Sequence, residues 1–598
     1  MKSHMLLLRR LLQECGSRCC TSTTLDYKTI ESRVKAEGYS FLTITLPNFG
    51  KDLEKGLDQG KVDSTLFAGY AKNGCLPRFL GGFTSLVFDK RSGLLLDNPS
   101  IDAIRSIRQI SLMFGKVKIE CSKARIQAAI DKYVECEQQV RISDSKVSIF
   151  QMEDIRRISD LLFMDVLLDI DRKVYEGNLI PKHGPGATAD KLKGNRKFKQ
   201  TEWTERLEEW FPHGEFLFPS WSHFCEAPST DLLDPGSERP VKVITVPKTL
   251  KTPRIIAVEP TAMQYAQQAL LEPLVSNIET DNLVSPLVGF TDQAPNQEMA
   301  REGSITGALA TLDLSEASDR VSNQHVRNQF ASFRSFAGAL DACRSRKADI
   351  PGYGVKRLAK YASMGSALCF PIEAMVFLTI VFYGIEKELG KPLTRKTVKQ
   401  FHGRVRVYGD DIIVPVDYVQ SVVSTLEAFG LKVNAGKSFW TGKFRESCGK
   451  EYYNGADVSL VRVREMFPTQ RKHVSEIVSI VSLRNQLYKA YYWDTCKHLD
   501  KYIERLIPFP AVAETSPALG KHNFWSYDCQ KMCSYLQRPL VKAFVVSAVP
   551  PKDPLDGPGA LLKYFLKRGD QPFADTKHLE RAGRPSVVDI KLRWVPSY

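Results

Sequence analysis

Apolar residues recur at helical spacing in the first third of the chain, most regularly over residues 155–175. This pattern predicts an amphipathic helix there, and residues 1 to about 180 are expected to be mostly helical. The first fourteen residues also have an apolar face, but Arg9 and Arg10 interrupt it and no cleavage site follows. A short amphipathic helix is therefore expected at the N-terminus rather than a signal peptide.

The pattern changes after a Gly- and Pro-containing break at residues 183–186. From residue 241 to about 455, short apolar runs typical of strands alternate with helical stretches. The chain then becomes mainly helical to about residue 506, and the remainder is expected to be proline-rich and irregular. The longest later apolar run, residues 374–383, is too short to span a bilayer, so a soluble protein without membrane contact is expected.

Length and composition favour a globular protein with several subdomains and a polyanionic partner. The chain has 598 residues, a net charge of +15 and 43% hydrophobic residues, with a pI near 9.1. A chain of this length is too long to fold around a single hydrophobic core. Lysines and arginines that neutralise phosphates favour nucleic acid, although acidic proteins and membrane surfaces attract the same charge. The 13 cysteines lack zinc-ligand spacing and are expected to be free thiols.

A basic run beside an aromatic stretch follows the break at residue 186. The cations are Lys191, Lys193, Arg196, Lys197 and Lys199, and the aromatics are Trp203, Trp210, Phe211, Phe216, Phe218, Trp221 and Phe224. Such a combination can hold single-stranded RNA through phosphate contacts and base stacking. A solvated charged loop beside ordinary core aromatics explains it equally well.

The strongest chemical signal lies at residues 404–415, RVRVYGDDIIVP. Val405 and Val407 alternate with arginines, which predicts a half-buried strand, and a second apolar strand follows the two aspartates. Gly409 and Asp410 suit a two-residue hairpin turn between these strands. Adjacent carboxylates at a rigid tip repel each other unless a cation compensates, although Gly-Asp is also a common structural turn.

A third carboxylate ends another apolar strand. Residues 307–312 lead into Asp313, and Ser315 is expected to cap the helix that follows. Asp319, farther on, lies near the sugar of a nucleotide in one interpretation and faces solvent in the other. Asp313 with Asp410 and Asp411 would supply the oxygen ligands that Mg²⁺ prefers in nucleotidyl transfer.

Three cations at a spacing of three residues precede these motifs. Lys248, Lys251 and Arg254 lie on an extended segment that becomes an apolar strand. Arginine can bind phosphate through two hydrogen bonds and lysine as a point charge. Taken alone, this spacing is common on protein surfaces. Beside a carboxylate metal site, the three cations would bind a triphosphate.

Six motifs in order resemble a known family. They are HGPGAT at 183–188, VPK at 246–248, DLSEASD at 313–319, SMG at 363–365, YGDD at 408–411, and ESCGK at 446–450 followed by Tyr452 and Tyr453. Together they resemble viral RNA-dependent RNA polymerases, and more narrowly the replicase subunit of the single-stranded RNA bacteriophages, the leviviruses. The resemblance covers roughly residues 180 to 460.

The resemblance implies an α+β right-hand polymerase fold with an antiparallel palm sheet between fingers and thumb. The expected divisions are a helical N-terminal region at 1–180, fingers at 181–300, palm at 301–460, and thumb with a basic C-terminal region at 461–598. It also implies template-directed RNA synthesis by two Mg²⁺ ions, with Mn²⁺ or Ca²⁺ as alternatives.

The same resemblance assigns site residues. The metal ligands would be Asp313, Asp410 and Asp411. Lys437 would protonate pyrophosphate, with a surface salt bridge as its alternative role. The implied substrate-binding residues are Lys248, Lys251, Arg254, Ser318, Asp319, Ser363, Gly365 and Tyr408. Tyr452 and Tyr453 would lie near the nascent strand or in the palm core.

This chain departs from the family pattern at two places. Ser366 and Ala367 stand where asparagine and glycine are expected, which reduces the backbone freedom of that loop. Glu451 stands where histidine is usual.

The implied partners are RNA template, nascent RNA and ribonucleoside triphosphates. Host elongation factors Tu and Ts and a ribosomal RNA-binding protein would join them in the bacterial cytoplasm.

Three alternatives stay open. A reverse transcriptase also has an aspartate pair on a hairpin, but the absence of an aromatic residue at 314–318 favours ribonucleotides. A related replicase of a capsidless eukaryotic or mitochondrial element is a second alternative. A catalytically inactive RNA-binding subunit is the third, and the three retained carboxylates argue against it.

Overall fold

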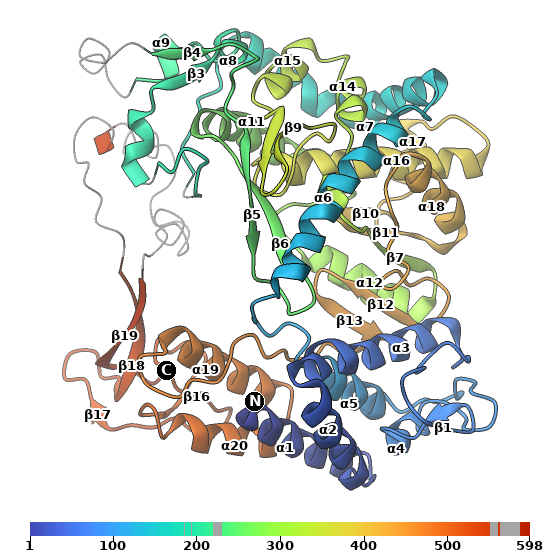
Figure 1. Ribbon diagram of the computed structural model, residues 1–598, viewed down its shortest axis with the longest axis vertical. Coiled ribbons are helices and arrows are strands. Elements are labelled where there is room, and N and C mark those ends of the chain that lie inside the picture. The colour runs from blue at the N-terminus through green and yellow to red at the C-terminus, as the bar shows by residue number, and fades with distance from the viewer. Residues whose placement is uncertain (185, 193, 219–229, 550–559, 562–586) are drawn as a thin grey trace.

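The protein has an α+β architecture, as the sequence predicted (Figure 1). The computed structural model describes residues 1–184, 186–192, 194–218, 230–549, 560–561 and 587–598. Helices from both ends of the chain form the lower part in Figure 1, and the middle of the chain forms the upper part. Each part has its own large hydrophobic core.

The upper core is built from long helices around a small sheet. Helix α7 (Ile149–Tyr175) begins at a capping box formed by Ser148 and Gln151, and its buried face repeats from Ile155 to Val174. Helix α16 (Cys369–Leu389) is apolar on all sides and central to this core. The remaining helices of this part are α6 (Lys123–Asp144), α8 (Glu205–Glu208), α9 (His213–Phe216), α11 (Thr261–Thr280), α12 (Ala294–Thr306), α13 (Ala317–Arg320), α14 (Asn323–Gln329), α15 (Arg334–Ala342), α17 (Arg395–Lys399) and α18 (Val419–Ala428), with 3-10 turns η2 (Gly194–Lys199) and η3 (Val416–Tyr418).

The lower core joins the two ends of the chain. Leu7, Leu8, Leu11 and Leu12 of α1 pack in the same cluster as Ile477 of α19 and other C-terminal residues. The N-terminal elements are α1 (Lys2–Arg18), α2 (Thr24–Glu37), the π-helix η1 (Phe41–Thr45), α3 (Leu46–Gln59), β1 (Lys72–Asn73), β2 (Leu76–Pro77), α4 (Gly81–Thr84) and α5 (Ile101–Leu112). The C-terminal helices are α19 (Val474–Lys489) and α20 (Trp493–Ile503).

The predicted divisions of the chain do not follow these cores. Residues 1–117 pack with residues 439–544, whereas α7, which also lies before residue 180, packs in the upper core. The boundary expected at residue 180 is therefore not a boundary between cores. Mostly helical structure before residue 180 is confirmed.

A three-stranded antiparallel sheet lies at the centre, in the order β10–β11–β7. Its strands are β7 (Leu309–Asp313), β10 (Arg406–Tyr408) and β11 (Asp411–Pro415). Arg406 is buried in β10 and donates hydrogen bonds to Asn296 and to the carbonyl of Ser285. The predicted alternation of valine inward and arginine outward is therefore wrong at Arg406.

A four-stranded sheet in the order β6–β5–β8–β9 lies to the left of it in Figure 1. Its strands are β5 (Val241–Val246), β6 (Arg254–Val258), β8 (Lys347–Ile350) and β9 (Gly354–Arg357). A further small sheet pairs β12 (Phe444–Ser447), β13 (Lys450–Tyr453) and β14 (Ala456–Asp457), and β3 (Glu202–Thr204) pairs with β4 (Asp231–Leu233).

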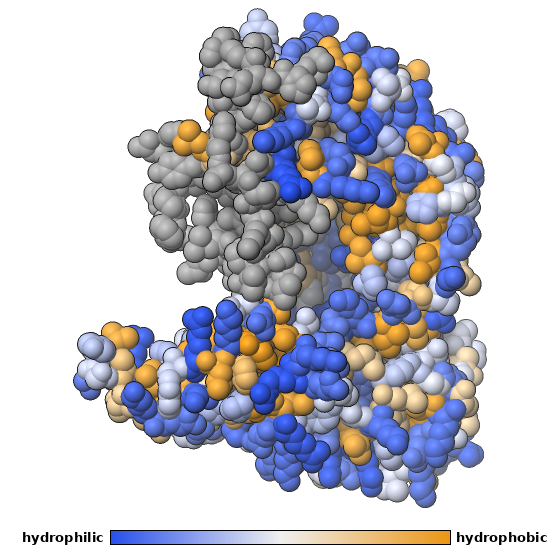
Figure 2. Space-filling model, turned by 60° about the vertical axis from the view of Figure 1, so that its left-hand side comes forward, coloured by the Kyte–Doolittle hydropathy of each residue, from blue (hydrophilic) through white to orange (hydrophobic). Residues whose placement is uncertain are grey.

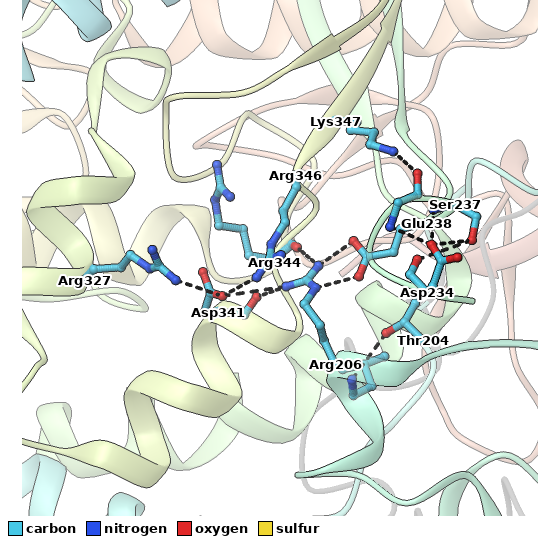
Figure 3. Close-up of polar contacts among 12 residues, drawn as sticks. Thr204, Arg206, Asp234, Ser237, Glu238, Arg327, Asp341, Arg344, Arg346 and Lys347 are labelled. Atoms are coloured by element: carbon cyan, nitrogen blue, oxygen red, sulfur yellow. Dashed lines mark hydrogen bonds and ion pairs between the residues drawn. The ribbon is translucent and has the colours of Figure 1, made fainter. Parts of the chain in front are cut away.

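A network of ion pairs and hydrogen bonds connects the β3–β4 region to the segment that leads into β8 (Figure 3). Arg206 binds both carboxylate oxygens of Glu238, at 2.6 and 2.7 Å, and the backbone carbonyls of Asp341 and Arg344. Asp341 also pairs with Arg346. Arg344 in turn donates to the carbonyls of Lys360 and Tyr361. These hydrogen bonds hold the backbone immediately before Ser363 in place.

The C-terminal region contains more regular structure than expected. β18 (Pro539–Val549) and β19 (Val587–Pro596) pair antiparallel over their whole length, and β17 (Lys531–Met532) extends their sheet. β15 (Ala511–Val512) and β16 (Lys521–His522) form a short parallel pair. The prediction of an irregular chain after residue 506 is therefore wrong.

The longest apolar helix is longer than the sequence pattern indicated. Among the described residues, α16 alone is long and apolar enough to cross a membrane, with a mean hydropathy of 1.6, and 89% of its apolar window is buried inside the protein. The expectation of a run too short to span is corrected, and the burial shows that α16 is packed as a core helix. All described cysteines are free thiols.

Candidate active site

Two strands bring the three predicted aspartates together. Tyr408 pairs with Asp411 across the β10–β11 hairpin, so Gly409 and Asp410 form a two-residue turn, as predicted. Gly409 has a φ of 60°, which glycine adopts without strain. Asp411 lies directly opposite Asp313 of the neighbouring strand β7.

The segment after α18 borders the other edge of β7 and holds Asp313. Thr311 bridges to Phe439 and Leu314 to Val433. Asn434 donates a hydrogen bond to Asp313 Oδ2 at 2.8 Å, and Lys437 Nζ lies 3.2 Å from Oδ1. The Lys437 side chain is 47% exposed, so its ion pair with Asp313 lies at the surface of the carboxylate cluster, and the salt-bridge alternative stays open.

The helix after Asp313 begins differently from the prediction. Helix α13 has only four residues and starts after Glu316, whose φ is 53°. The backbone N–H of Ser315 donates to the carbonyl of Lys432, on the bordering segment. The predicted capping role of Ser315 is therefore wrong.

Burial, followed by the charge of neighbouring carboxylates, raises the pKa of Asp410 and Asp411. Burial raises the pKa of Asp411 to about 6, with the nearby Asp410 as the second cause. Asp410 is accessible at the hairpin tip, but surrounding protein crowds it. That crowding, followed by the charge of Asp313, raises the pKa of Asp410. Partial burial opposes the charged form of Lys437, but Glu446 and Asp313 more than offset it and raise the pKa of Lys437.

These residues suit a divalent cation by their chemistry. Within the described ranges, no three His, Cys, Asp or Glu side chains stand together in a ligand cluster. Asp313 and Asp411 are cross-strand neighbours, however, and the raised pKa values of Asp410 and Asp411 show negative charge that a cation would compensate. Carboxylate oxygens are the ligands that Mg²⁺ prefers, so these three residues would hold it.

A second polar cluster surrounds Asp319. Its Oδ1 accepts hydrogen bonds from Ser363 at 3.1 Å and Lys360 at 3.0 Å. Tyr133 contacts both partners, through a 2.9 Å hydrogen bond with Ser363 and through its ring beneath Lys360 Nζ. The structure thus brings Asp319 and Ser363 together, and Asp319 does not simply face solvent.

The neighbouring predicted residues have structural contacts. Gly365 has a φ of 137°, and a Cβ there would overlap the carbonyl of Ala257 in β6, so only glycine fits. Ser318 lies beside the buried thiol of Cys369. Tyr408 donates a 2.8 Å hydrogen bond to the carbonyl of Phe290.

The three predicted phosphate-binding cations lie around the β5–β6 turn. Lys248 and Lys251 are exposed in that turn and Arg254 is exposed at the start of β6. Although Lys248 is accessible, desolvation by the surrounding protein lowers its pKa, with Arg254 and Lys437 as further causes, while Asp410 and Asp313 act in the opposite direction. Lys248 therefore lies within electrostatic range of the carboxylates.

The basic and aromatic stretch is mainly structural where it is described. Trp203 and Phe211 are buried in the upper core, and Lys197 donates to the carbonyls of Gly184 and Gly186. His183 stacks on Tyr265 with ring centres 4.1 Å apart. Lys193, Trp221 and Phe224 lie outside the described residues.

The two tyrosines at the end of β13 are buried in the interior. Tyr452 and Tyr453 are 8% and 2% exposed, which favours the palm-core interpretation. Glu451, the departure from the family pattern, forms ion pairs with Arg108 at 2.8 Å and Arg462 at 3.3 Å. Its carboxylate is thus matched to two buried or half-buried arginines.

Sequence reasoning missed several residues of the site. Asn434, Lys360 and Tyr133 hold the predicted aspartates or their partners. Glu373 of α16 is buried near Asp410 and Asp319, and burial raises its pKa well above the ordinary value. Asn434 lies three residues before Lys437, which the sequence had singled out; the others lack a local sequence signal.

Comparison with known proteins shows what this region is similar to. Residues 234–500 match the family described as RNA replicase, beta-chain. The RNA-directed RNA polymerase subunit beta of Escherichia virus Qbeta is 34% identical over 254 residues, which are 42% of this chain and 38% of that protein. The RNA-directed RNA polymerase beta chain of Escherichia phage MS2 is 32% identical over 249 residues, 41% of this chain and 40% of that protein. The predicted resemblance to a phage replicase is confirmed over this region.

The matched region contains all three aspartates, Lys437 and the three cations predicted to bind phosphate. The chain spans about two fifths of the length of these curated relatives. Among solved structures, the polymerase of a human picorbirnavirus aligns with a TM-score of 0.33 and 10% identity, over 44% of this chain and 59% of that one. The BmCPV RNA-dependent RNA polymerase at elongation state gives a TM-score of 0.35 at 10% identity, over 69% of this chain and 38% of that one.

Proposed function

We propose that this chain is the catalytic subunit of an RNA-directed RNA polymerase, which copies an RNA template from ribonucleoside triphosphates. The observation that carries the proposal is the placement of Asp410 and Asp411 on a hairpin directly beside Asp313, within the region that matches the replicase family. The relatives' names support RNA as template and product.

Two Mg²⁺ ions held by the three aspartates would supply charge neutralisation and activation of the 3′-hydroxyl. The protein itself contributes position and charge. Lys248 and Arg254 would bind the phosphates. Lys437 is held beside Asp313 in its charged form, where it can give a proton to the leaving pyrophosphate.

The Asp319 cluster would select the sugar. Ser363 and Lys360 fix the orientation of the Asp319 carboxylate, which leaves acceptor capacity for a ribose hydroxyl. Residues 314–318 include no aromatic side chain that would exclude a 2′-hydroxyl. Both features favour ribonucleotides over the reverse-transcriptase alternative.

The host elongation factors Tu and Ts and a ribosomal RNA-binding protein stay part of this proposal. So does the bacterial cytoplasm as the place of action. The family resemblance supports them.

The test is incorporation of labelled ribonucleotides on an RNA template with Mg²⁺, with and without bacterial extract. Asp410→Asn should reduce incorporation by at least roughly 10³-fold, because metal-assisted stabilisation of the transition state contributes several kcal/mol. Asp417→Asn, an exposed aspartate shortly after the hairpin, is the matched control and should retain activity.

Normal incorporation by Asp410→Asn would refute the metal assignment. A folded wild-type protein that is inactive on several templates, even with extract, would instead favour an RNA-binding subunit.

A further inference from the structure

A basic cavity adjoins the carboxylates and is not explained by the predicted site residues alone. It has a volume of about 330 Å³ and lies between the β5–β6 turn and the lower part of the molecule. Its lining includes five cations and one carboxylate: Lys116, Lys118, Lys248, Arg254, Arg464 and Glu465. Figure 2 shows the molecule hollowed between its lower and upper parts, with hydrophilic residues along the lower edge.

Backbone pairing fixes the lower wall of this cavity. The N–H of Lys118 donates to the carbonyl of Arg464 at 2.8 Å, and Val463 donates to Met113 at 3.0 Å. The segment after α5 and the segment before α19 are thus joined, which places Lys116 and Arg464 on one wall.

The same N-terminal segment reaches the opposite wall. Arg125 Nη1 donates to the carbonyl of Leu250 at 2.7 Å, and the thiol of Cys121 lies 3.0 Å from the carbonyl of Thr249. Both acceptors lie in the β5–β6 turn, beside Lys248. The N-terminal segment therefore closes the cavity against the turn that carries the predicted phosphate ligands.

Most cations of the cavity form no ion pair with a described carboxylate. Glu465 is paired with Lys118 at 3.4 Å. No ion pair with a described carboxylate is found for Lys116, Arg464, Lys248 or Arg254. Burial, followed by the charges of Arg462, Arg464 and Lys437, lowers the pKa of Lys116 to about 8. Clustered cations of this kind are unfavourable until an anion enters.

We propose that Lys116 and Arg464, which line this cavity together with Lys248 and Arg254, are additional contacts to the triphosphate of the entering ribonucleotide. The inference rests on the proposed function and adds residues from the N-terminal and C-terminal segments to its substrate site. A compact cavity of this volume fits a small ligand rather than a length of RNA backbone. Lys437, which approaches both Lys116 and Asp313, connects the cavity with the carboxylates.

The experiment measures kcat and the KM for each nucleotide in incorporation on a primed RNA template. Lys116→Ala and Arg464→Gln should each raise KM about 10-fold with little change in kcat, since a charge-assisted phosphate contact is lost. Lys116→Arg keeps the charge and should restore a KM near wild type. Lys123→Ala, an exposed lysine seven residues farther on, is the matched control. The affinity for template RNA should not change in any variant.

Unchanged KM in both Lys116→Ala and Arg464→Gln would overturn the proposal. A loss of RNA affinity without a change in KM would overturn it too, and would assign the cavity to RNA backbone. Thermal unfolding identifies any variant that fails to fold, and Lys116→Gln then replaces Lys116→Ala.

A separate binding measurement distinguishes this proposal from the proposed function. Titration calorimetry with inorganic tripolyphosphate needs no turnover. If wild type binds tripolyphosphate and Lys116→Ala binds it about 10-fold more weakly, the cavity assignment holds even for a chain that does not polymerise. If wild type does not bind tripolyphosphate, the cavity is not a polyphosphate site.

Discussion

At the scale of single residues, Glu259 is a buried carboxyl group with a measurable effect on stability. It is 4% exposed and accepts a hydrogen bond from Ser345. Burial raises its pKa from 4.5 to about 7, so the folded state holds the proton more tightly than the unfolded state. The resulting stability is fully present below pH 4.5 and is lost as the pH rises to about 7. Glu259→Gln should therefore be more stable than wild type at pH 8, by roughly 3 kcal/mol.

Urea unfolding at pH 5 and pH 8 checks this expectation. The difference between variant and wild type should be small at pH 5 and large at pH 8. Glu272→Gln, which removes an exposed carboxylate from α11, the helix that follows Glu259, should leave the pH profile unaltered. Parallel profiles for Glu259→Gln and wild type would show that Glu259 does not titrate in this range.

At the scale of elements, the β10–β11 hairpin depends on one glycine. Gly409 has positive φ, and a Cβ there would overlap the ring of Phe370. Gly409→Ala should therefore lower the free energy of unfolding in two ways. A non-glycine residue in the left-handed region costs about 1–2 kcal/mol, and the added Cβ no longer fits against Phe370. Incorporation should also fall, because the aspartates shift. Gly403 has a φ of 72° with open space around it. Gly403→Ala should therefore show only the cost of the left-handed backbone.

The comparison of these two glycines is made by thermal unfolding together with incorporation. Adding Phe370→Leu should recover part of the loss in Gly409→Ala and nothing in Gly403→Ala. Equal destabilisation of both single variants would mean that the Phe370 contact does not constrain the turn.

At the scale of the whole molecule, Arg108 links the N-terminal helices to β13. It is fully buried on α5 and binds Glu54 of α3 at 2.9 Å and Glu451 of β13 at 2.8 Å. Arg108→Met would leave two carboxylates buried beside each other, which should cost about 3–5 kcal/mol. Combining it with Glu54→Gln and Glu451→Gln should recover much of that loss.

Urea unfolding of the full chain measures this effect. Arg105→Met, on the same helix but with its side chain 39% exposed, should change stability by less than about 1 kcal/mol. Similar losses in both arginine variants would argue against a special role for the buried network.

Local patterns predicted the elements that carry the candidate site, and long-range packing was beyond them. The hairpin at Gly409 and the strand ending at Asp313 each have a short-range signal, so both were predicted and both occur. The β18–β19 pair was not predicted, because residues 550–586 separate its strands. The contact of Lys118 with Arg464 joins positions far apart in sequence, and no periodicity reports such a contact.

The shared core of the two chain ends also sets an order of events during synthesis. Leu7 and Phe41 belong to a core that includes Phe544 and Ile590. At about 5–20 residues per second, a ribosome needs roughly 20–90 s to advance from the end of the N-terminal helices to the β18 strand. Throughout that interval the apolar faces of α1, α3 and α5 lack their C-terminal partners. Helices α1, α3 and α5 are therefore among the last elements to complete their packing, and we expect a nascent chain to expose their apolar faces during this interval.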